Sequence, residues 1–378
     1  MLYKQEHHIF REAFKRFVAE HITPNVDAWE EAGEVSRDAW LAMGEYGFLL
    51  PWLPEKYGGY AADFLYSVII MDEICHAGAV GFFAPLHSEI VAPYIMTYGS
   101  EEQKAEWLPK AASGECILAV AMSEPNAGSD LASLKCRAEL DGDEWVLNGT
   151  KTFISNGGTA DLTIVAAKTE RGVKDSSAIS LFLVPSTAPG YRVGSRFSKM
   201  GLHSQDTAEI ILDECRIPAK MILGERGKGF KYLMNKLQQE RIVLTIQAQA
   251  MSEKMLEMTV KYAQERKAFG QSVASMQHNA FKIAKMATEI NIGRAYLDSL
   301  VFRHMKGDNI VTEVSMAKSW VAEMANRVAY DCVQLHGGYG YMEEYPICRF
   351  ARDIRIFSIF GGTTEVMNLI IARSMGVI

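Results

Sequence analysis

Apolar residues recur at every third or fourth position in the first part of the chain, a spacing typical of helices. The pattern begins with Ile9, Phe10, Phe14, Phe17 and Val18, and it returns over residues 66–77. Prolines and the pair Gly58-Gly59 interrupt it, as expected of turns between helices. We therefore expect an N-terminal α-helical domain at residues 1–115.

Between residues 116 and 224 the pattern changes to short runs that are rich in β-branched residues or alternate in polarity. These runs cover residues 116–122, 144–147, 162–167 and 179–184. The tripeptide Asp141-Gly142-Asp143 stands between two such stretches and is a hairpin signal. The middle segment, 116–224, is thus predicted to be a small antiparallel β domain.

Helical spacing returns after this segment in long stretches, which predicts a C-terminal α-helical domain at residues 225–378. Turns that contain glycine break it at residues 269–270, 306–308, 336–338 and 360–362. The order of helices, strands and helices assigns the chain to the α+β class. Ligands of such proteins usually bind in clefts where the domains meet.

Glu240 is the most informative single residue, because it falls on an apolar helical face. At 100° per residue, Leu233, Leu237, Glu240 and Leu244 lie within an arc of roughly 60°. Burial should raise the pKa of this carboxyl group, which suits a general base. The alternative is a structural glutamate at a helix bend or in an ion pair with Arg241 or a distant cation.

Two short segments are candidates for ligand binding. Residues 122–130 follow an apolar strand and combine proline, glycine and two serines, so the loop offers amides and hydroxyls to a polar ligand. Residues 151–158 place Phe153 and Ser155 two positions apart, hence on one face of a strand, where a ring and a donor would suit a flat cofactor. The alternatives are a surface turn and an ordinary strand with a buried phenylalanine.

Composition excludes several classes of function. The net charge is −7 and no block of Lys and Arg is present, which argues against nucleic acid as a partner. The six cysteines are scattered without a CxxC pair, so we expect reduced thiols, most of them buried, and no metal site. No apolar run approaches the roughly 20 residues of a membrane span. A signal peptide, an HExxH motif and a GxSxG motif are absent too.

Six motifs occur in an order and spacing that resemble those of the acyl-CoA dehydrogenases. They are MSEPNAGSD at 122–130, KTFISNGG at 151–158, KMGLHSQDTAE at 199–209, QERKAFG at 264–270, QLHGGYGYM at 334–342 and FGGTTE at 360–365. The long-chain type is the most similar subfamily. The resemblance implies an N-terminal helical domain, a middle antiparallel β domain and a C-terminal four-helix bundle.

The resemblance also implies which residues bind FAD and substrate. Ser129 and Arg241 match substrate contacts, near the thioester and the pantetheine end of CoA respectively. The positions that match FAD contacts are Met122, Ser123, Ser129, Phe153, Ile154, Ser155, Arg266, Gln277, Gln334, Leu335, His336, Gly337, Gly338, Thr363, Thr364 and Glu365. The part that binds the pyrophosphate and adenosine is expected to lie partly across a subunit boundary.

For the reaction, the resemblance implies that Glu240 removes the α proton of an acyl-CoA thioester while the β carbon passes hydride to flavin N5. Medium- and short-chain relatives carry their catalytic glutamate in the loop position held here by Gly361. The backbone N–H of Gly361 is still expected to stabilise negative charge on the thioester oxygen. The product would be a trans-2-enoyl-CoA.

The same likeness implies a homotetramer that passes electrons to an electron-transfer flavoprotein and acts on a long-chain or branched acyl-CoA. A cytoplasmic location is expected, and the mature form of a mitochondrial matrix protein is an alternative. Two other functions fit the motifs. One is a flavin-dependent oxidase or monooxygenase on the same fold, and the other is a catalytically silent binding protein.

Overall fold

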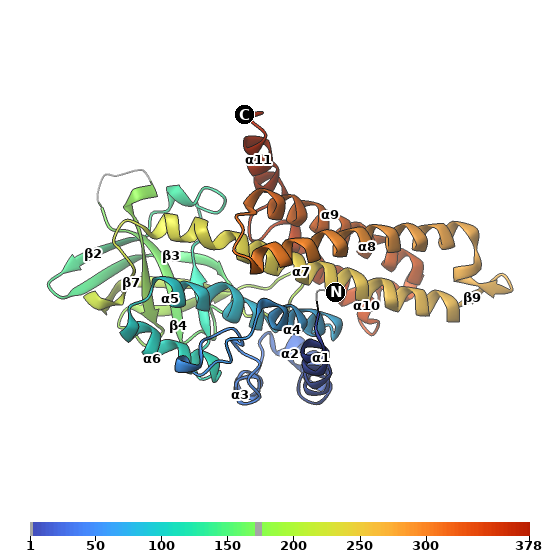
Figure 1. Cartoon of the computed structure of the whole chain (residues 1–378), viewed down its shortest axis with the longest axis horizontal. Helices are drawn as coiled ribbons and strands as arrows, with labels where there is room; N and C mark the ends of the chain where they lie inside the picture. The colour runs from blue at the N-terminus through green and yellow to red at the C-terminus, as the bar shows by residue number, and fades with distance from the viewer. Residues whose placement is uncertain (1–2, 171–175) are drawn as a thin grey trace.

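The computed structural model describes residues 3–170 and 176–378, which form three parts that follow one another along the chain (Figure 1). A helical part comes first, a sheet lies at one end of the molecule, and long helices extend to the other end. The α+β class with helical, β and helical domains is therefore confirmed.

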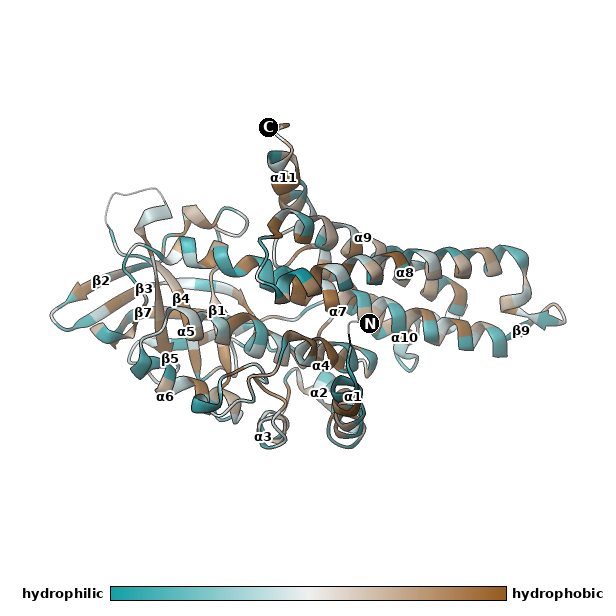
Figure 2. Cartoon of the chain, in the orientation of Figure 1, coloured by the Kyte–Doolittle hydropathy of each residue, from teal (hydrophilic) through white to brown (hydrophobic). Residues whose placement is uncertain are grey.

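The N-terminal part is built around α4, a helix that is buried on nearly every side and mostly apolar (Figure 2). Asp63 caps α4 by accepting a hydrogen bond from Leu65 N at 3.0 Å. A π-helical turn, η4 (Leu86–Val91), runs directly into α5. The helices are α1 (Gln5–Phe17), α2 (Val26–Ala32), α3 (Arg37–Glu45), α4 (Phe64–His76), α5 (Ala92–Tyr98) and α6 (Glu101–Ala112).

The middle part is one sheet with eight strands among the described residues. Seven of them follow the order β6-β7-β3-β2-β4-β5-β8, and β1 pairs with β4. The predicted hairpin is confirmed, since Asp141 pairs with Glu144 and leaves a two-residue turn. The strands are β1 (Leu118–Ala121), β2 (Arg137–Asp141), β3 (Glu144–Ile154), β4 (Leu162–Lys168), β5 (Ile179–Pro185), β6 (Tyr191–Arg196), β7 (Ala208–Pro218) and β8 (Ile222–Leu223).

The sheet is not antiparallel throughout. Strand β1 runs parallel to β4, in register from Leu118 with Leu162, and β2 meets β4 in parallel at Arg137 and Lys168. A parallel pair needs a long connection, and the chain between β1 and β4 supplies one through the 122–130 loop and the β2–β3 hairpin. The expectation of antiparallel pairing holds for the remaining neighbours in this sheet.

The C-terminal part consists of three long helices and two short ones. The predicted breaks are confirmed: residues 269–270 form a hairpin turn, 306–308 join two helices, 336–338 end one and 360–362 precede another. Helix α11 projects away from the long helices and carries the C-terminus (Figure 1). The elements are α7 (Gly229–Glu265), β9 (Lys267–Ala268), β10 (Gln271–Ser272), α8 (Gln277–Met305), α9 (Val311–His336), α10 (Pro346–Asp353), η10 (Ile354–Ser358) and α11 (Thr364–Ser374).

The chemistry of the cysteines agrees with the expectation of reduced thiols. All six are free, and only Cys348 is not buried.

Among the residues that the structure describes, no helix is long and apolar enough to cross a membrane. No group of three or more His, Cys, Asp or Glu side chains that could hold a metal ion was found within this same part of the chain.

A buried ion network joins the N-terminal helices to the long C-terminal ones. Arg294 of α8 donates to Asp72 of α4 at 3.1 Å and to Glu253 of α7 at 2.7 and 2.8 Å. Asp72 is only 4% exposed, so its charge depends on this partner and on Arg11. Burial lowers the pKa of Arg294, but the adjacent carboxylates outweigh it and hold the pKa above its usual value.

We expect Arg294→Met to lower the free energy of unfolding by about 3–5 kcal/mol, because two carboxylates would lose a buried partner. The measurement is the midpoint of the first thermal transition. Arg303→Met is the matched control, since Arg303 lies on the same helix but pairs with Asp308 and Glu313 at the surface. Equal midpoints for the two variants would contradict the assignment.

Candidate active site

Glu240 lies within α7 on the face that the sequence predicted. Leu233 and Leu244 on this face are buried, and Glu240 itself is 9% exposed. Its Oε2 is buried and has no hydrogen-bond partner among the described residues. Burial raises the pKa of Glu240 to about 7, against the opposing effects of Arg241 and Lys318. The carboxyl group is therefore poised to exchange a proton near neutral pH.

The loop at Gly361 and Gly362 lies directly against this carboxylate. Both glycines have positive φ, +63° and +101°. A Cβ atom at Gly361 would come within 2.3 Å of Leu244 Cδ1 and 3.6 Å of Glu240 Oε1. The loop therefore packs on α7 so closely that only glycine fits at 361 without a shift of Leu244.

Arg241 points to the same loop. Its side chain is 4% exposed, and Nε donates to Gly361 O at 3.4 Å. Burial lowers the pKa of this guanidinium, while Glu240 raises it. Arg241 is thus no helix-surface residue, and its predicted contact with substrate stays a prediction.

Helix α5 and the π-helical turn η4 complete the surroundings of the base. Tyr94 of α5 is completely buried, and its hydroxyl has no partner among the residues described here. Burial raises the pKa of Tyr94, and the nearby Glu240 carboxylate raises it further. Gln239 donates to Glu89 O at 2.8 Å, which ties α7 to η4 next to the base.

The 122–130 loop is held in place by a buried ion pair that the sequence did not reveal. Lys151 is completely buried and donates to Glu124 Oε1 at 2.7 Å and to Met122 O at 3.2 Å. Glu124 also accepts from the backbone N–H groups of residues 135 and 136. Of the three predicted ligand contacts here, Met122 and Ser123 are half-buried, and Ser129 is exposed.

The segment around Phe153 differs from the expected regular strand. The pairing of β3 with β7 shifts register between Lys151 and Ile154, and Phe153 has a positive φ of +57°. The alternation of side chains between the two faces of the strand therefore breaks before Ser155. The prediction that Phe153 and Ser155 lie on one strand face is wrong. The irregular backbone turns Phe153 outward, where its ring is 67% exposed, while Ile154 stays buried.

Gln205 fixes the turn that follows Phe153. Its Nε2 donates to Asn156 Oδ1 at 2.6 Å, and Asn156 Nδ2 in turn donates to Leu118 O at 3.2 Å. Asn156 has a positive φ of +59° and is 1% exposed, so the turn is held from inside the protein. This bond connects the 199–209 motif to the 151–158 motif.

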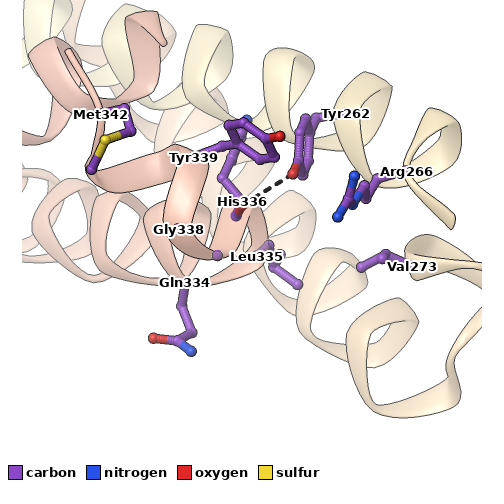
Figure 3. Close-up of a pocket in the computed structure, with 10 residues that line it drawn as sticks. Tyr262, Arg266, Val273, Gln334, Leu335, His336, Gly338, Tyr339 and Met342 are labelled. Carbon is purple, nitrogen blue, oxygen red and sulfur yellow. Dashed lines mark hydrogen bonds between the residues drawn. The ribbon is translucent and has the colours of Figure 1, made fainter. Parts of the chain in front are cut away.

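A cavity of about 550 Å³ lies at the far end of the helical domain, between the end of α7 and the end of α9 (Figure 3). The Tyr262 ring stacks on His336 with 4.3 Å between centroids, and its hydroxyl donates to His336 O at 3.1 Å. The predicted residues that line it are Arg266, Gln334, Leu335, His336, Gly337 and Gly338. The resemblance placed these residues together, and the structure does so as well.

Arg266 is the cation of this cavity. It is exposed, it lies 5.7 Å from the centre of the Tyr339 ring, and no carboxylate of the described chain forms an ion pair with it. A guanidinium in such a setting suits the oxygens of a diphosphate. Gln277, at the start of α8, is exposed and does not line the cavity.

The remaining predicted contacts lie at the start of α11. Thr363 caps this helix by accepting from Val366 N at 3.3 Å, and Thr364 donates to Glu323 at 2.9 Å. Glu365 is exposed in the first turn. The hydroxyls of Thr363 and Thr364 thus already take part in bonds within the chain.

Two residues near Glu240, Lys318 and Tyr94, were not predicted from the sequence. Lys318 of α9 is 1% exposed and donates to Gly362 O, and Tyr94 lies near the base. Lys318 gave one signal, because it stands among Val314, Ala317 and Val321 on an apolar helical face. Tyr94 gave none, since an aromatic residue on a helix is ordinarily part of the core.

We expect Gly361→Ala to lower the free energy of unfolding by about 1–3 kcal/mol, through backbone strain at positive φ and the clash with Leu244. Thermal melting measures the loss. The double variant with Leu244→Ala should lose less than the sum of the two single changes, because the clash is removed. Strict additivity of the two losses would show that the loop does not pack on Leu244.

Comparison with known proteins gives a consistent picture. Three family models match the chain: "Acyl-CoA dehydrogenase, N-terminal domain" over residues 4–115, the middle domain over 119–215 and the C-terminal domain over 227–376. The long-chain specific acyl-CoA dehydrogenase of Sus scrofa mitochondria is 44% identical, over 99% of this chain and 87% of that protein. Mitochondrial isovaleryl-CoA dehydrogenase of Pongo abelii is 36% identical, over 98% and 88%.

Solved structures agree. The acyl-CoA dehydrogenase from Geobacillus kaustophilus has a TM-score of 0.97 and 51% identity, over 99% of this chain and 98% of that one. A glutaryl-CoA dehydrogenase from Mycobacterium smegmatis in complex with FADH2 has a TM-score of 0.92 and 29% identity, over 100% and 96%. The chain therefore belongs to the acyl-CoA dehydrogenase family, flavoprotein oxidoreductases that use FAD and act on CH–CH donors.

Proposed function

We propose that this protein oxidises an acyl-CoA to the trans-2-enoyl-CoA with Glu240 as the catalytic base. The observation that supports this most is the position of Glu240, buried in α7 with an unpartnered Oε2 and next to the Gly361 loop. A carboxyl group with a pKa of about 7 is ionised often enough at neutral pH to accept a proton from carbon.

A carboxylate cannot remove an α proton unless the negative charge on the thioester oxygen is stabilised. The Gly361 N–H is suited to this task, since it finds no backbone acceptor within the described chain. Arg241 holds the carbonyl of Gly361 and so fixes the 361–362 peptide, which directly follows this N–H in the loop. Preorganised donors of this kind cost no reorganisation during the reaction.

FAD, when bound, supplies the acceptor for the hydride that leaves the β carbon. The exposed Phe153 ring and the hydroxyls at 123, 129 and 155 fit its ring and its polar chain. The cation of Arg266 fits the diphosphate of an FAD molecule. Ile154 and Met122 would contribute backbone and apolar contacts. Gln277, Gln334 to Gly338, and Thr363 to Glu365 complete the proposed set.

Arg266 and Glu240 cannot serve the same FAD molecule within one chain. Arg266 follows the last residue of α7, 26 positions after Glu240. At about 1.5 Å per residue, the helix separates them by about 39 Å, more than the length of an extended FAD. We therefore propose that the Arg266 cavity binds FAD held by another subunit, in the homotetramer that the family resemblance implies.

The substrate and the electron acceptor are inferred from relatives. The names of the two mitochondrial relatives indicate long-chain and branched acyl groups, so we propose one of these classes, with Ser129 and Arg241 in contact with the acyl-CoA. Electron-transfer flavoprotein is the proposed acceptor. The free thiols fit a reducing compartment such as the cytoplasm, or the mitochondrial matrix.

We expect Glu240→Gln to retain FAD but to slow anaerobic bleaching of the flavin by an acyl-CoA by on the order of 10²–10⁴-fold, the usual contribution of a general base. Stopped-flow absorbance near the flavin band measures the rate. A panel of acyl-CoAs that differ in length and branching identifies the best substrate first. Near-normal bleaching by the variant would show that the base is another group.

We expect Arg266→Ala to bind FAD about 10- to 100-fold more weakly, since a charge-assisted hydrogen bond contributes about 1.5–3 kcal/mol. Titration of the FAD-free variant with FAD gives the Kd. Lys267→Ala is the matched control, because Lys267 is the adjacent exposed cation and does not line the cavity. The spectrum of bound flavin should stay unchanged, and an unaltered Kd would rule out the assignment.

A further inference from the structure

Two buried cations hold the Gly361-Gly362 loop by consecutive carbonyl groups. Arg241 of α7 donates to Gly361 O, and Lys318 of α9 donates to Gly362 O. The two helices pack side by side, so the loop is bound from both. Fixing both carbonyls fixes the planes of the 361–362 and 362–363 peptides, the two that directly follow the Gly361 N–H.

Burying the charge of Lys318 costs free energy, and its surroundings do not fully offset that cost. It is 1% exposed, and the carbonyl of Gly362 is its one hydrogen-bond acceptor among the described residues. Burial and the neighbouring Arg241 lower its pKa to about 8, whereas Glu240, Glu323 and Glu365 act in the opposite direction. A neutral side chain would fill this position at a lower cost.

The charged groups that face Glu240 explain what Lys318 does there. Arg241 lies on the same helix, Lys318 lies on α9, and Tyr94 of α5 contributes an uncharged phenol. Both cations oppose the effect of burial on the pKa of Glu240, which would otherwise rise further. A base that stayed protonated at neutral pH could not accept a proton.

We propose that Lys318 is a positioning residue with two effects: it holds the Gly361-Gly362 loop in its left-handed conformation, and its charge keeps Glu240 ionised for catalysis. This inference rests on the proposed function of Glu240. Lys318 acts through the loop and the base and not through contact with substrate or cofactor.

The test is the pH dependence of flavin bleaching in a single turnover. In the unaltered protein the rate should rise with pH through a midpoint near 7, because only ionised Glu240 acts as a base. Lys318→Met and Lys318→Gln remove the charge and should move this midpoint upward by about one pH unit. Lys318→Arg retains the charge and should leave the midpoint in place, even where the rate falls.

The Gln variant keeps an N–H donor for Gly362 O and serves if the Met variant does not fold. Lys254→Met is the control for loss of a lysine, since Lys254 lies on α7 and pairs with Glu257 at the surface. FAD content and melting temperature are measured for every variant. A rate that drops equally at all pH values, with an unmoved midpoint, overturns the inference. Absence of bleaching in the unaltered protein by every acyl-CoA would instead overturn the proposed function.

Discussion

The burial of one carboxyl group in the middle of a long helix is the constraint on which the rest of this structure depends. Glu240 has little contact with solvent, so its charge must be balanced by groups of the protein itself. The balance comes from α7 through Arg241 and from α9 through Lys318. These two cations also bind the loop that closes over the carboxylate, so charge balance and loop geometry have the same origin.

The sheet contributes a second prearranged surface. The Lys151–Glu124 pair fixes the 122–130 loop to β3, and Gln205 fixes the turn after Phe153. Both interactions are buried, so the exposed groups on this side of the sheet are attached to a rigid framework. An exposed aromatic ring at a strained backbone position is unusual in a free protein, and it is consistent with a flat ligand that covers it.

The sequence predicted the order of the domains and the glycine breaks, because hydrophobic spacing and turn residues are local signals. It also predicted the face of α7 on which Glu240 lies. The parallel pairing of β1 with β4 was not predictable, since it depends on where a long connection returns. The same holds for the bulge at Phe153 and for Lys318, whose partner Gly362 is 44 residues away in the chain.

The close contact between Gly361 and Leu244 has a consequence for how such a site could change over time. A glutamate placed at 361 would meet Leu244 at once and stand beside the carboxylate already present at 240. Two negative charges would then share one buried site, and a side chain at 361 would be strained at the positive φ of this position. Transfer of the base from helix to loop would therefore involve positions 240, 244 and 361 together. Sterics and charge together hold the base at position 240. Through the packing of Leu244, the effects of substitutions at 240, 244 and 361 depend on one another, which is a form of epistasis.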